Sequence, residues 1–416
     1  MSLDHNPRPN DDEAAPTASF RFSTVEPLDR LGEVALAPCS RPIPPEARSV
    51  PETSVERRRA SSFGASLDKD EHLPEKITEQ QEGGISVSET AKPDESVLYL
   101  AYGSNMASKT FLGVRGIKPI SQIRVLIPEL QLTFDLPGMP YVEPCFAATK
   151  PRDPSPIDQD IISLDDDDEI ESTGAEILSE KAPLLETREI KSAGQHNHQW
   201  DKPLVGVVYE VTLADYAKII ASEGGGRGYV DVVIDCYPFA EDYKPTDPVP
   251  NSPKTEPFKA HTLLAPGVDD ALMKSSSITR CTQHTPSVWW DVGLPVRPIP
   301  GYAQPTARYL NLLVSGAAEH DLPVSYQEYL SHSRTYRITT TRQKIGKALF
   351  LLLWGPFALA ILRLSKSCAG PDGRNPPWLA AFANFVFVAK WKSYDCFFKL
   401  VFGDGERTMD DPPPTE

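Results

Sequence analysis

The sequence VLYLAYGSNM, residues 97–106, changes character in its middle. Its first six residues are apolar, β-branched or aromatic, which is typical of a buried strand. Gly103, Ser104 and Asn105 follow directly, and these residue types favour a tight loop. Because binding and catalytic groups often lie on loops that a rigid element positions, we expect this loop to contribute to a functional site.

The composition limits both the size of the core and the class of partner. The chain has 416 residues and 41 prolines, roughly twice the average frequency, so much of it is predicted not to pack. Its net charge is −16, and no patch of lysine and arginine alternates with aromatic residues. These features argue against nucleic-acid binding and favour small-molecule or protein partners.

The cysteines and the first residues indicate the compartment. None of the six cysteines forms a CxxC pair or a disulfide-framework spacing, which fits a reducing compartment and argues against a cysteine metal site. Residues 1–16 are polar and acidic, unlike a signal or transit peptide. The globular part is therefore predicted to be cytosolic.

The chain divides into four regions by composition. Residues 1–94 are rich in Pro, Ser, Glu and Arg and show no sustained periodicity, so we expect a disordered arm. Residues 95–340 are expected to fold as one domain, with insertions at about 151–202 and 238–257. A hydrophobic tail covers 341–400, and 401–416 is polar.

Several segments of the folded domain have the pattern of strands or short helices. The expected strands are residues 97–102, a segment around 121–135, an apolar stretch at 145–150, 204–211, 229–236 and 260–265. The expected helices are 213–222, one beginning near 309 and one beginning near 325. Residues 275–301 read as a loop.

The tail contains an apolar run, residues 348–362, with basic residues on both sides. The run is shorter than the roughly 20 residues that usually span a bilayer, and Gly355-Pro356 is expected to kink it. A second apolar stretch covers 378–391. One interpretation is a pair of helices packed on the domain. The favoured one is a membrane anchor through about 345–390, either a tilted span or a hairpin in one leaflet.

Four separated stretches share the order of a known family: YLAYGSNM (99–106), GVVYEVTLADYAKIIASEGGGRGYVDVVI (206–234), AHTLLA (260–265) and YLNLLVSGAAEHDLPVSYQEYL (309–330). Together they resemble the γ-glutamylcyclotransferase family, and the hydrophobic tail points to a fungal member. The resemblance covers about 150 residues. It implies an α+β fold, a small mixed β-barrel flanked by helices.

The resemblance also implies a reaction. The α-amine of a γ-glutamyl group attacks its own γ-carbonyl, which yields 5-oxoproline and releases an amino acid or amine. The implied substrates are γ-glutamyl amino acids or glutathione-derived conjugates, and neither a metal nor an organic cofactor is required. The implied enzyme is a carbon–nitrogen lyase whose catalytic domain is cytosolic and whose tail meets a membrane. A wholly cytoplasmic protein is the alternative.

Two sets of residues suit this chemistry. The α-ammonium must lose a proton before it attacks, and a buried carboxylate is a suitable base because burial raises its proton affinity. Glu223, at the end of the helix 213–222, matches the family's catalytic glutamate. The N–H groups of Gly103, Ser104 and Asn105 can form a nest for the substrate carboxylate, with Gly103 at positive φ.

Two tyrosines complete the predicted substrate-binding set. Tyr229 resembles the family's tyrosine after the glutamate, and Tyr102 directly precedes the Gly-Ser-Asn loop. Both are also common as core residues of half-buried strands. The turn EGGGRGY is looser than in the family, and Arg227 within it is not assigned a catalytic role.

Other motifs fail on their context. EGGGRG follows a helix and lacks the Gly-Lys-Ser/Thr ending of a phosphate loop, and QHNHQW lies in the polar insertion without a third ligand at useful spacing. Two rival functions stay open. One is a non-catalytic module of the same fold that binds a carboxylate or a protein, and the other is a γ-glutamylamine cyclotransferase.

Overall fold

The computed structural model describes residues 50–63, 66–70, 73, 96–152, 200–223, 230–264, 278–280, 297, 299–370 and 372–409. The strands are β1 Ser96–Ala101, β2 Ser121–Ile127, β3 Leu130–Met139, β4 Glu143–Pro151, β5 Leu204–Thr212, β6 Val230–Pro238, β7 Phe258–Leu264 and β8 Ile278–Arg280. The longer helices are α2 Val55–Ser62, α5 Leu213–Ser222, α7 Ala307–Glu319, α8 Val324–His332, α9 Thr341–Cys368 and α10 Pro377–Ser393.

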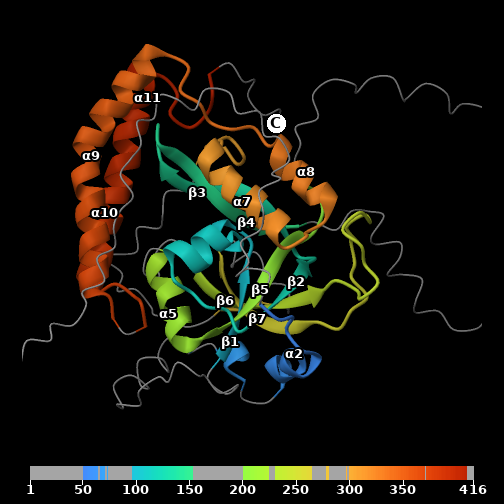
Figure 1. The fold of residues 1–416 in the computed structure, drawn as a ribbon. Helices are drawn as coiled ribbons and strands as arrows, with labels where there is room; N and C mark the ends of the chain where they lie inside the picture. The colour runs from blue at the N-terminus through green and yellow to red at the C-terminus, as the bar shows by residue number, and fades with distance from the viewer. Residues whose placement is uncertain are drawn as a thin grey trace, which may run out of the picture. The chain divides into compact units, whose positions relative to one another are not determined.

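Five strands close into a barrel in the order β2-β5-β1-β7-β6, and β6 pairs back to β2 (Figure 1). The β1–β7 pair is parallel and the other pairs are antiparallel. Helices flank this mixed barrel, and the short strand β8 adds to β6. The predicted α+β fold with a small mixed barrel is confirmed.

Strand β1 lies in the wall of this barrel, between β5 and β7. Every residue from Ser96 to Ala101 is buried, so the strand is apolar along its whole length rather than alternating. Helix α7 packs against the loop that follows β1. A Cβ on Gly316 of α7 would lie 2.7 Å from the backbone nitrogen of Ala107, so only glycine permits this close approach.

Part of the N-terminal arm departs from the expectation of disorder. Helix α2, capped by Ser54, and a short 3₁₀ turn at Leu67–Lys69 contact the barrel. Arg57 of α2 binds the carboxylates of Asp68, at 2.7 Å, and of Glu210 in β5, at 2.8 Å. Charge pairing rather than apolar periodicity holds this segment, so the hydrophobic pattern of the sequence did not indicate it, and the expectation needs correction here.

Two other expectations also need correction. The segment around 121–135 forms two strands, β2 and β3, separated by a turn at Pro128-Glu129, and β3 pairs with β4 as a separate two-stranded ribbon. The stretch 275–301 contains β8, which lies within the region predicted to be a loop. A three-residue strand is too short to show a recognisable period.

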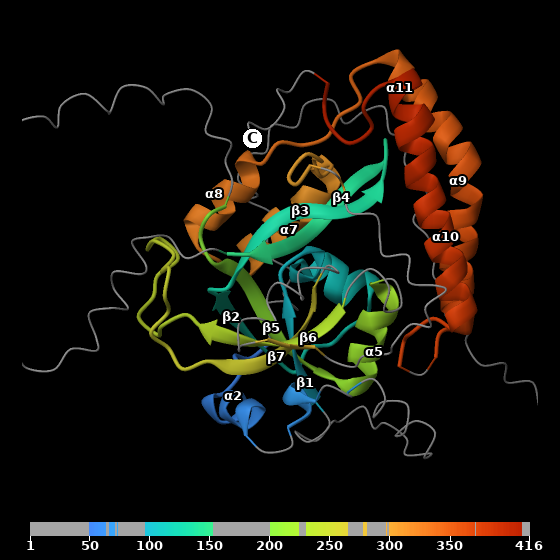
Figure 2. The ribbon, with the colours of Figure 1, turned by 180° about the vertical axis from the view of Figure 1, so that it is seen from behind.

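The tail forms two long helices, α9 and α10, which lie side by side in both views (Figures 1 and 2). Helix α9 has 28 residues and continues through Pro356, so the predicted Gly-Pro kink does not end it. A capping box of Thr340 and Gln343 fixes its first turn. Among the residues that the structure describes, α9 alone is long and apolar enough to cross a membrane.

Candidate functional site

The loop after β1 carries Asn105 into the interior of the site. Residues Ser104–Met106 form a single 3₁₀ turn directly after the buried strand, and Asn105 is buried. The Asn105 amide nitrogen donates to the hydroxyl of Tyr99, at 2.9 Å, and to Oε1 of Glu223, at 3.1 Å. The first and second motifs of the sequence therefore meet in space through one hydrogen bond.

Glu223 occupies the carboxyl end of helix α5. The side chain of Thr212 caps the start of this helix, and Glu223 caps its end through an N–H bond to the carbonyl of Ile219. Six of the ten residues of α5 are buried, which fixes the helix against the barrel. The carboxylate is therefore held at a defined place beside the end of β1.

Arg115 is the residue of the site that the sequence did not reveal. It follows a π-helical turn at Lys109–Val114, and its guanidinium donates to Oε1 of Glu223 at 2.5 Å and to the hydroxyl of Ser222. The side chain of Arg115 is mostly buried. It lies ten positions after Asn105 with no motif around it, so no sequence signal distinguished it from a surface arginine.

The two oxygens of the Glu223 carboxylate differ in their partners. Asn105 and Arg115 both donate to Oε1. Within the part of the chain that the structure describes, Oε2 accepts no hydrogen bond, and it is not among the fully buried atoms that lack a partner. One oxygen thus orients the group, and the side chain of Glu223 keeps 18% of its surface exposed.

Three buried tyrosines surround this carboxylate. Burial raises the pKa of Tyr99, Tyr102 and Tyr309, and the negative charge of Glu223 raises the pKa of each of them further. All three hydroxyls are therefore protonated at neutral pH. The hydroxyl of Tyr309 accepts a hydrogen bond from the Ala147 N–H at 3.0 Å and keeps its own proton to donate.

The predicted carboxylate nest has a different backbone from the one expected. Gly103 has φ −114°, so it does not take the positive φ that the sequence suggested. The helical turn that follows provides the local bend instead, which removes the need for left-handed backbone. In the described residues no hydrogen bond uses the N–H of Ser104 or Asn105, and their role toward a substrate carboxylate stays a prediction.

The two predicted tyrosines have different outcomes. The hydroxyl of Tyr102 donates to the carbonyl of Leu263 in β7 at 2.6 Å, so it ties β1 to β7 within the barrel. Its predicted contact with substrate is not tested by this geometry. Tyr229 lies outside the described residues, as does Arg227.

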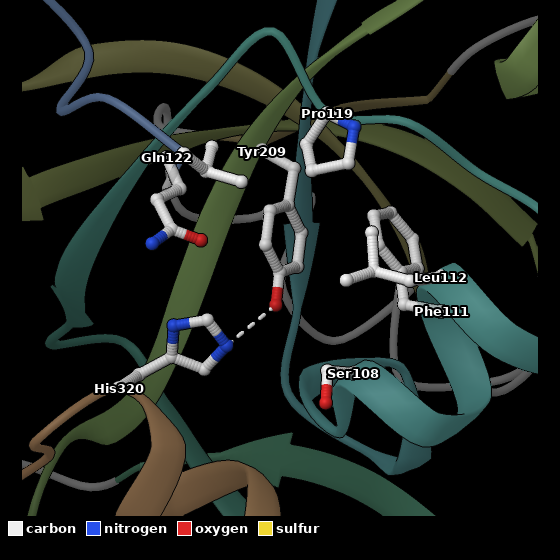
Figure 3. A pocket seen from close by; sticks show the side chains of 8 residues that line it. Ser108, Phe111, Leu112, Pro119, Gln122, Tyr209 and His320 are labelled. Carbon is white, nitrogen blue, oxygen red and sulfur yellow. Dashed lines mark hydrogen bonds between the residues drawn. The ribbon is translucent and has the colours of Figure 1, made fainter. Parts of the chain in front are cut away.

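A separate small pocket is lined by Ser108, Phe111, Tyr209 and His320, among other residues (Figure 3). Tyr209 and His320 form its polar wall, joined by a hydrogen bond of 2.7 Å, and His320 also bonds the carbonyl of Met106. Neither Glu223 nor Asn105 lines it. The side chains of Ser108 and Gln122 also line it, and the buried hydroxyl of Ser108 has no hydrogen-bond partner among the described residues.

The chain is similar to curated proteins along about three quarters of its length. It is 27% identical over 319 residues to the γ-glutamyl cyclotransferase aclK of Aspergillus oryzae, covering 75% of this chain and 91% of that protein. It is 26% identical over 315 residues to the γ-glutamyl cyclotransferase gliK of Aspergillus fumigatus, covering 76% and 90%.

Two further comparisons concern the tail and the fold. The family model described as the AclK C-terminal domain matches residues 340–401, which include α9 and α10. A solved structure named γ-glutamyl cyclotransferase overlaps 59% of this chain and 93% of its own, at 15% identity and a TM-score of 0.30. That overlap is too low to support the fold, which rests on the strand pairing. The sequence comparisons confirm the resemblance that the four motifs indicated: this chain is similar, over most of its length, to the γ-glutamyl cyclotransferases.

Proposed function

We propose that this protein is a γ-glutamyl cyclotransferase that converts the γ-glutamyl group of a small molecule to 5-oxoproline and releases an amino acid or amine. The observation that carries the proposal is the unequal bonding of the Glu223 carboxylate. Its Oε1 is fixed by Asn105 and Arg115, while Oε2 has no partner among the described residues. A general base needs this combination of fixed orientation and one available oxygen.

The proposed reaction begins with proton transfer from the substrate α-ammonium to Oε2 of Glu223. The freed amine attacks the γ-carbonyl carbon, and a new carbon–nitrogen bond closes a five-membered ring. The γ-amide bond then breaks as the proton passes from Glu223 to the departing nitrogen. The regenerated carboxylate accepts the second proton of the ring nitrogen and passes it to the released amine, which leaves as an ammonium. The ring is 5-oxoproline, and atoms and charge balance without a co-reactant.

The surrounding residues supply position and polarity. Arg115 and Asn105 hold the carboxylate in one orientation, which reduces the entropy lost when the base meets the amine. We assign the N–H groups of Gly103, Ser104 and Asn105 to the substrate carboxylate. Tyr309 is placed to donate toward the reacting group, because its hydroxyl lies 3.5 Å from the position of a Cβ on Gly103.

We also propose that the protein associates with a membrane through about residues 345–390, with the catalytic domain on the cytosolic side. The apolar helix α9 supports this location. The substrates that we propose are γ-glutamyl amino acids or glutathione-derived conjugates. The names of the relatives from Aspergillus support the γ-glutamyl group but do not specify what is attached to it.

A substrate panel tests the proposed function. The full-length chain is incubated with γ-glutamyl-alanine, γ-glutamyl-cysteine, glutathione and a γ-glutamyl-lysine isopeptide, and 5-oxoproline is measured by mass spectrometry. We expect 5-oxoproline from at least one of these. Binding without turnover would support the non-catalytic module instead, and turnover of the isopeptide alone would support a γ-glutamylamine cyclotransferase.

A further inference from the structure

The outer face of helix α9 is apolar, and within the described part of the chain its large side chains are left exposed. Exposed large apolar side chains recur along this face, with Leu352 at 75% exposure and Leu362 at 58%. Helix α10 adds Trp378 and Phe385, the latter at 71%. A contiguous apolar surface of this extent is unusual on a soluble protein and marks a binding surface.

The charges around this face have one sign. Neither α9 nor α10 contains an aspartate or glutamate, in a chain that has 58 acidic and 42 basic residues. Exposed basic residues lie at both ends of α9, among them Arg342 and Lys344 at the start and Arg363 and Lys366 at the end. Apolar side chains between cationic ends match the acyl chains and anionic headgroups of a bilayer surface.

One end of the helix pair is fixed to the β3–β4 ribbon. Lys390 of α10 donates to the carbonyl of Gly138 in β3 at 2.7 Å. Tyr141, in the turn between β3 and β4, packs in a buried aromatic cluster with Phe350 of α9 and Trp391 of α10. The hydroxyl of Tyr141 also bonds the carbonyl of Gly403.

The other end of the pair rests on helix α5. Gly373, in the turn between α9 and α10, is buried and has φ +77°. A Cβ at this position would lie 2.1 Å from the carbonyl oxygen of Ala217 and 3.0 Å from the nitrogen of Ala221. Both of these residues belong to α5, so the turn is seated on the helix that ends at Glu223 (Figure 1).

A helix pair that is held at both ends by the same domain has only its outer side free. At 28 residues α9 is about 42 Å long, so if it crossed a bilayer its distal end would lie in the opposite headgroup region, where the domain cannot follow, and the contact of the turn with α5 would be broken. Lying along the surface keeps every contact described here. The low polarity of the inner face is explained by its packing on the ribbon and on α10.

We propose that α9 and α10 form a docking surface for an anionic bilayer and that the pair lies along the membrane surface rather than across it. This inference rests on the membrane association proposed above and adds its geometry. The occupant is lipid, because the face combines exposed leucine and phenylalanine side chains with basic ends and no acidic residue.

A vesicle-binding experiment tests the occupant. The full-length chain is floated with phosphatidylcholine vesicles prepared with and without phosphatidylserine. We expect binding that phosphatidylserine strengthens, and a loss of at least about tenfold in the variant Leu352→Glu/Leu359→Glu. The control Phe63→Glu changes an equally exposed apolar residue outside the pair and is expected to bind normally. Unchanged binding by the double variant, or a dimer that it dissociates without any vesicle binding, overturns the proposal.

A thiol-labelling experiment tests the orientation. Cys368, at the end of α9, and Cys396, after α10, are exposed free thiols near opposite ends of the pair, whereas Cys145 and Cys236 are buried. In chains in which Cys39, Cys281 and one of the exposed pair are serine, microsomes are treated with a membrane-impermeant maleimide. We expect Cys368 and Cys396 to react alike without detergent. If Cys368 reacts only after detergent, the pair crosses the bilayer and the proposal fails.

These readouts do not depend on turnover. A chain that binds vesicles and labels as expected but forms no 5-oxoproline keeps this inference and loses the proposed reaction. A chain that forms 5-oxoproline but ignores vesicles gives the opposite result. The two proposals can therefore fail separately.

Discussion

Strand β1 and helix α9 are both apolar in sequence, yet the fold buries one and exposes the other. Leu98 and Leu100 of β1 are fully buried. In the most apolar 18-residue stretch of α9, by contrast, only 11% is buried. The backbone explains the difference. A strand must pair its N–H and C=O groups with neighbours, which bring apolar side chains with them, while a helix satisfies its backbone alone. An apolar strand therefore predicts a place in the protein core. An apolar helix predicts only an apolar environment, which can be the protein core or a lipid bilayer.

The same comparison separates the proposed catalytic site from the tail. The site is made where the buried strand ends and polar side chains meet, so single changes there should act on the reaction. The tail is proposed to act through its exposed face, so changes on that face should act on membrane binding, and only a change where the tail contacts α5 should reach the reaction. The predictions below follow from this division, in order of expected effect.

Replacing Glu223 by Gln should lower the rate of 5-oxoproline formation by about 10²- to 10⁴-fold, because the base is lost while the hydrogen bonds to Oε1 can be partly kept. The exposed Glu256→Gln is the matched control and should be fully active. The rates are compared by mass spectrometry, with circular dichroism to verify the fold. A Glu223→Gln enzyme of normal rate would assign the base to another residue.

Replacing Arg57 by Met should destabilise the fold by about 3 kcal/mol, because it leaves the buried carboxylate of Asp68 without its cation. Urea unfolding measures the change. The exposed Arg59→Met in the same helix should differ from the parent by less than about 0.5 kcal/mol. Equal stability of both variants would show that the N-terminal segment is not part of the cooperative unit.

Replacing Arg115 by Gln should lower kcat by roughly tenfold to a hundredfold with a smaller effect on KM, because Arg115 orients the carboxylate through Oε1. Arg115→Lys keeps the charge without the planar geometry and should recover part of the loss. Steady-state kinetics decide between the outcomes. A rise in KM alone, with kcat unchanged, would make Arg115 a substrate contact instead of a positioning residue.

The fold should become less stable as the pH is lowered, because His320 binds a proton more readily in the unfolded chain. Burial lowers the pKa of His320 to about 4, from an ordinary value of 6.5. The unfolded chain therefore binds the proton first, and stability is lost as the pH falls from about 6.5 to 4, by about 3 kcal/mol. Urea unfolding as a function of pH should show a shallower slope in this window for His320→Gln. An identical slope would mean that His320 does not titrate differently in the two states.

Replacing Gly373 by Ala should lower kcat only a few-fold, by pushing the turn away from α5 and loosening the helix end that carries Glu223. Gly355→Ala is the matched control, since a Cβ there meets nothing within 4 Å. Hydrogen exchange at 217–223 should rise in the first variant alone. No change in either readout would show that the tail and the site are mechanically independent.

The sequence predicted the parts of this molecule in which pattern and environment agree. The strands of the barrel and the helix 213–222 follow from apolar runs and turn residues, the α+β class follows from the family resemblance, and the structure confirms them. Glu223 and Asn105 could be chosen because their motifs occur in order, and the structure brings them into contact. Their catalytic roles stay predictions.

The rest depends on long-range contacts that have no local signature. Arg115 meets Glu223 across 108 positions, and Arg57 meets Glu210 across 153. A charged residue in a polar segment reads as solvated until its partner is known. The expectation of positive φ at Gly103 was wrong, because Gly103 has φ −114° and a 3₁₀ turn follows it, on a loop that α7 approaches closely at Gly316.

The most direct test of the account is the fate of a γ-glutamyl substrate in water enriched in ¹⁸O. Intramolecular attack by the α-amine predicts 5-oxoproline without ¹⁸O and no stoichiometric free glutamate, with the reaction depending on Glu223. Glutamate that carries ¹⁸O in its γ-carboxylate would mean that water is the nucleophile, and it would contradict the central claim that Glu223 serves a cyclisation.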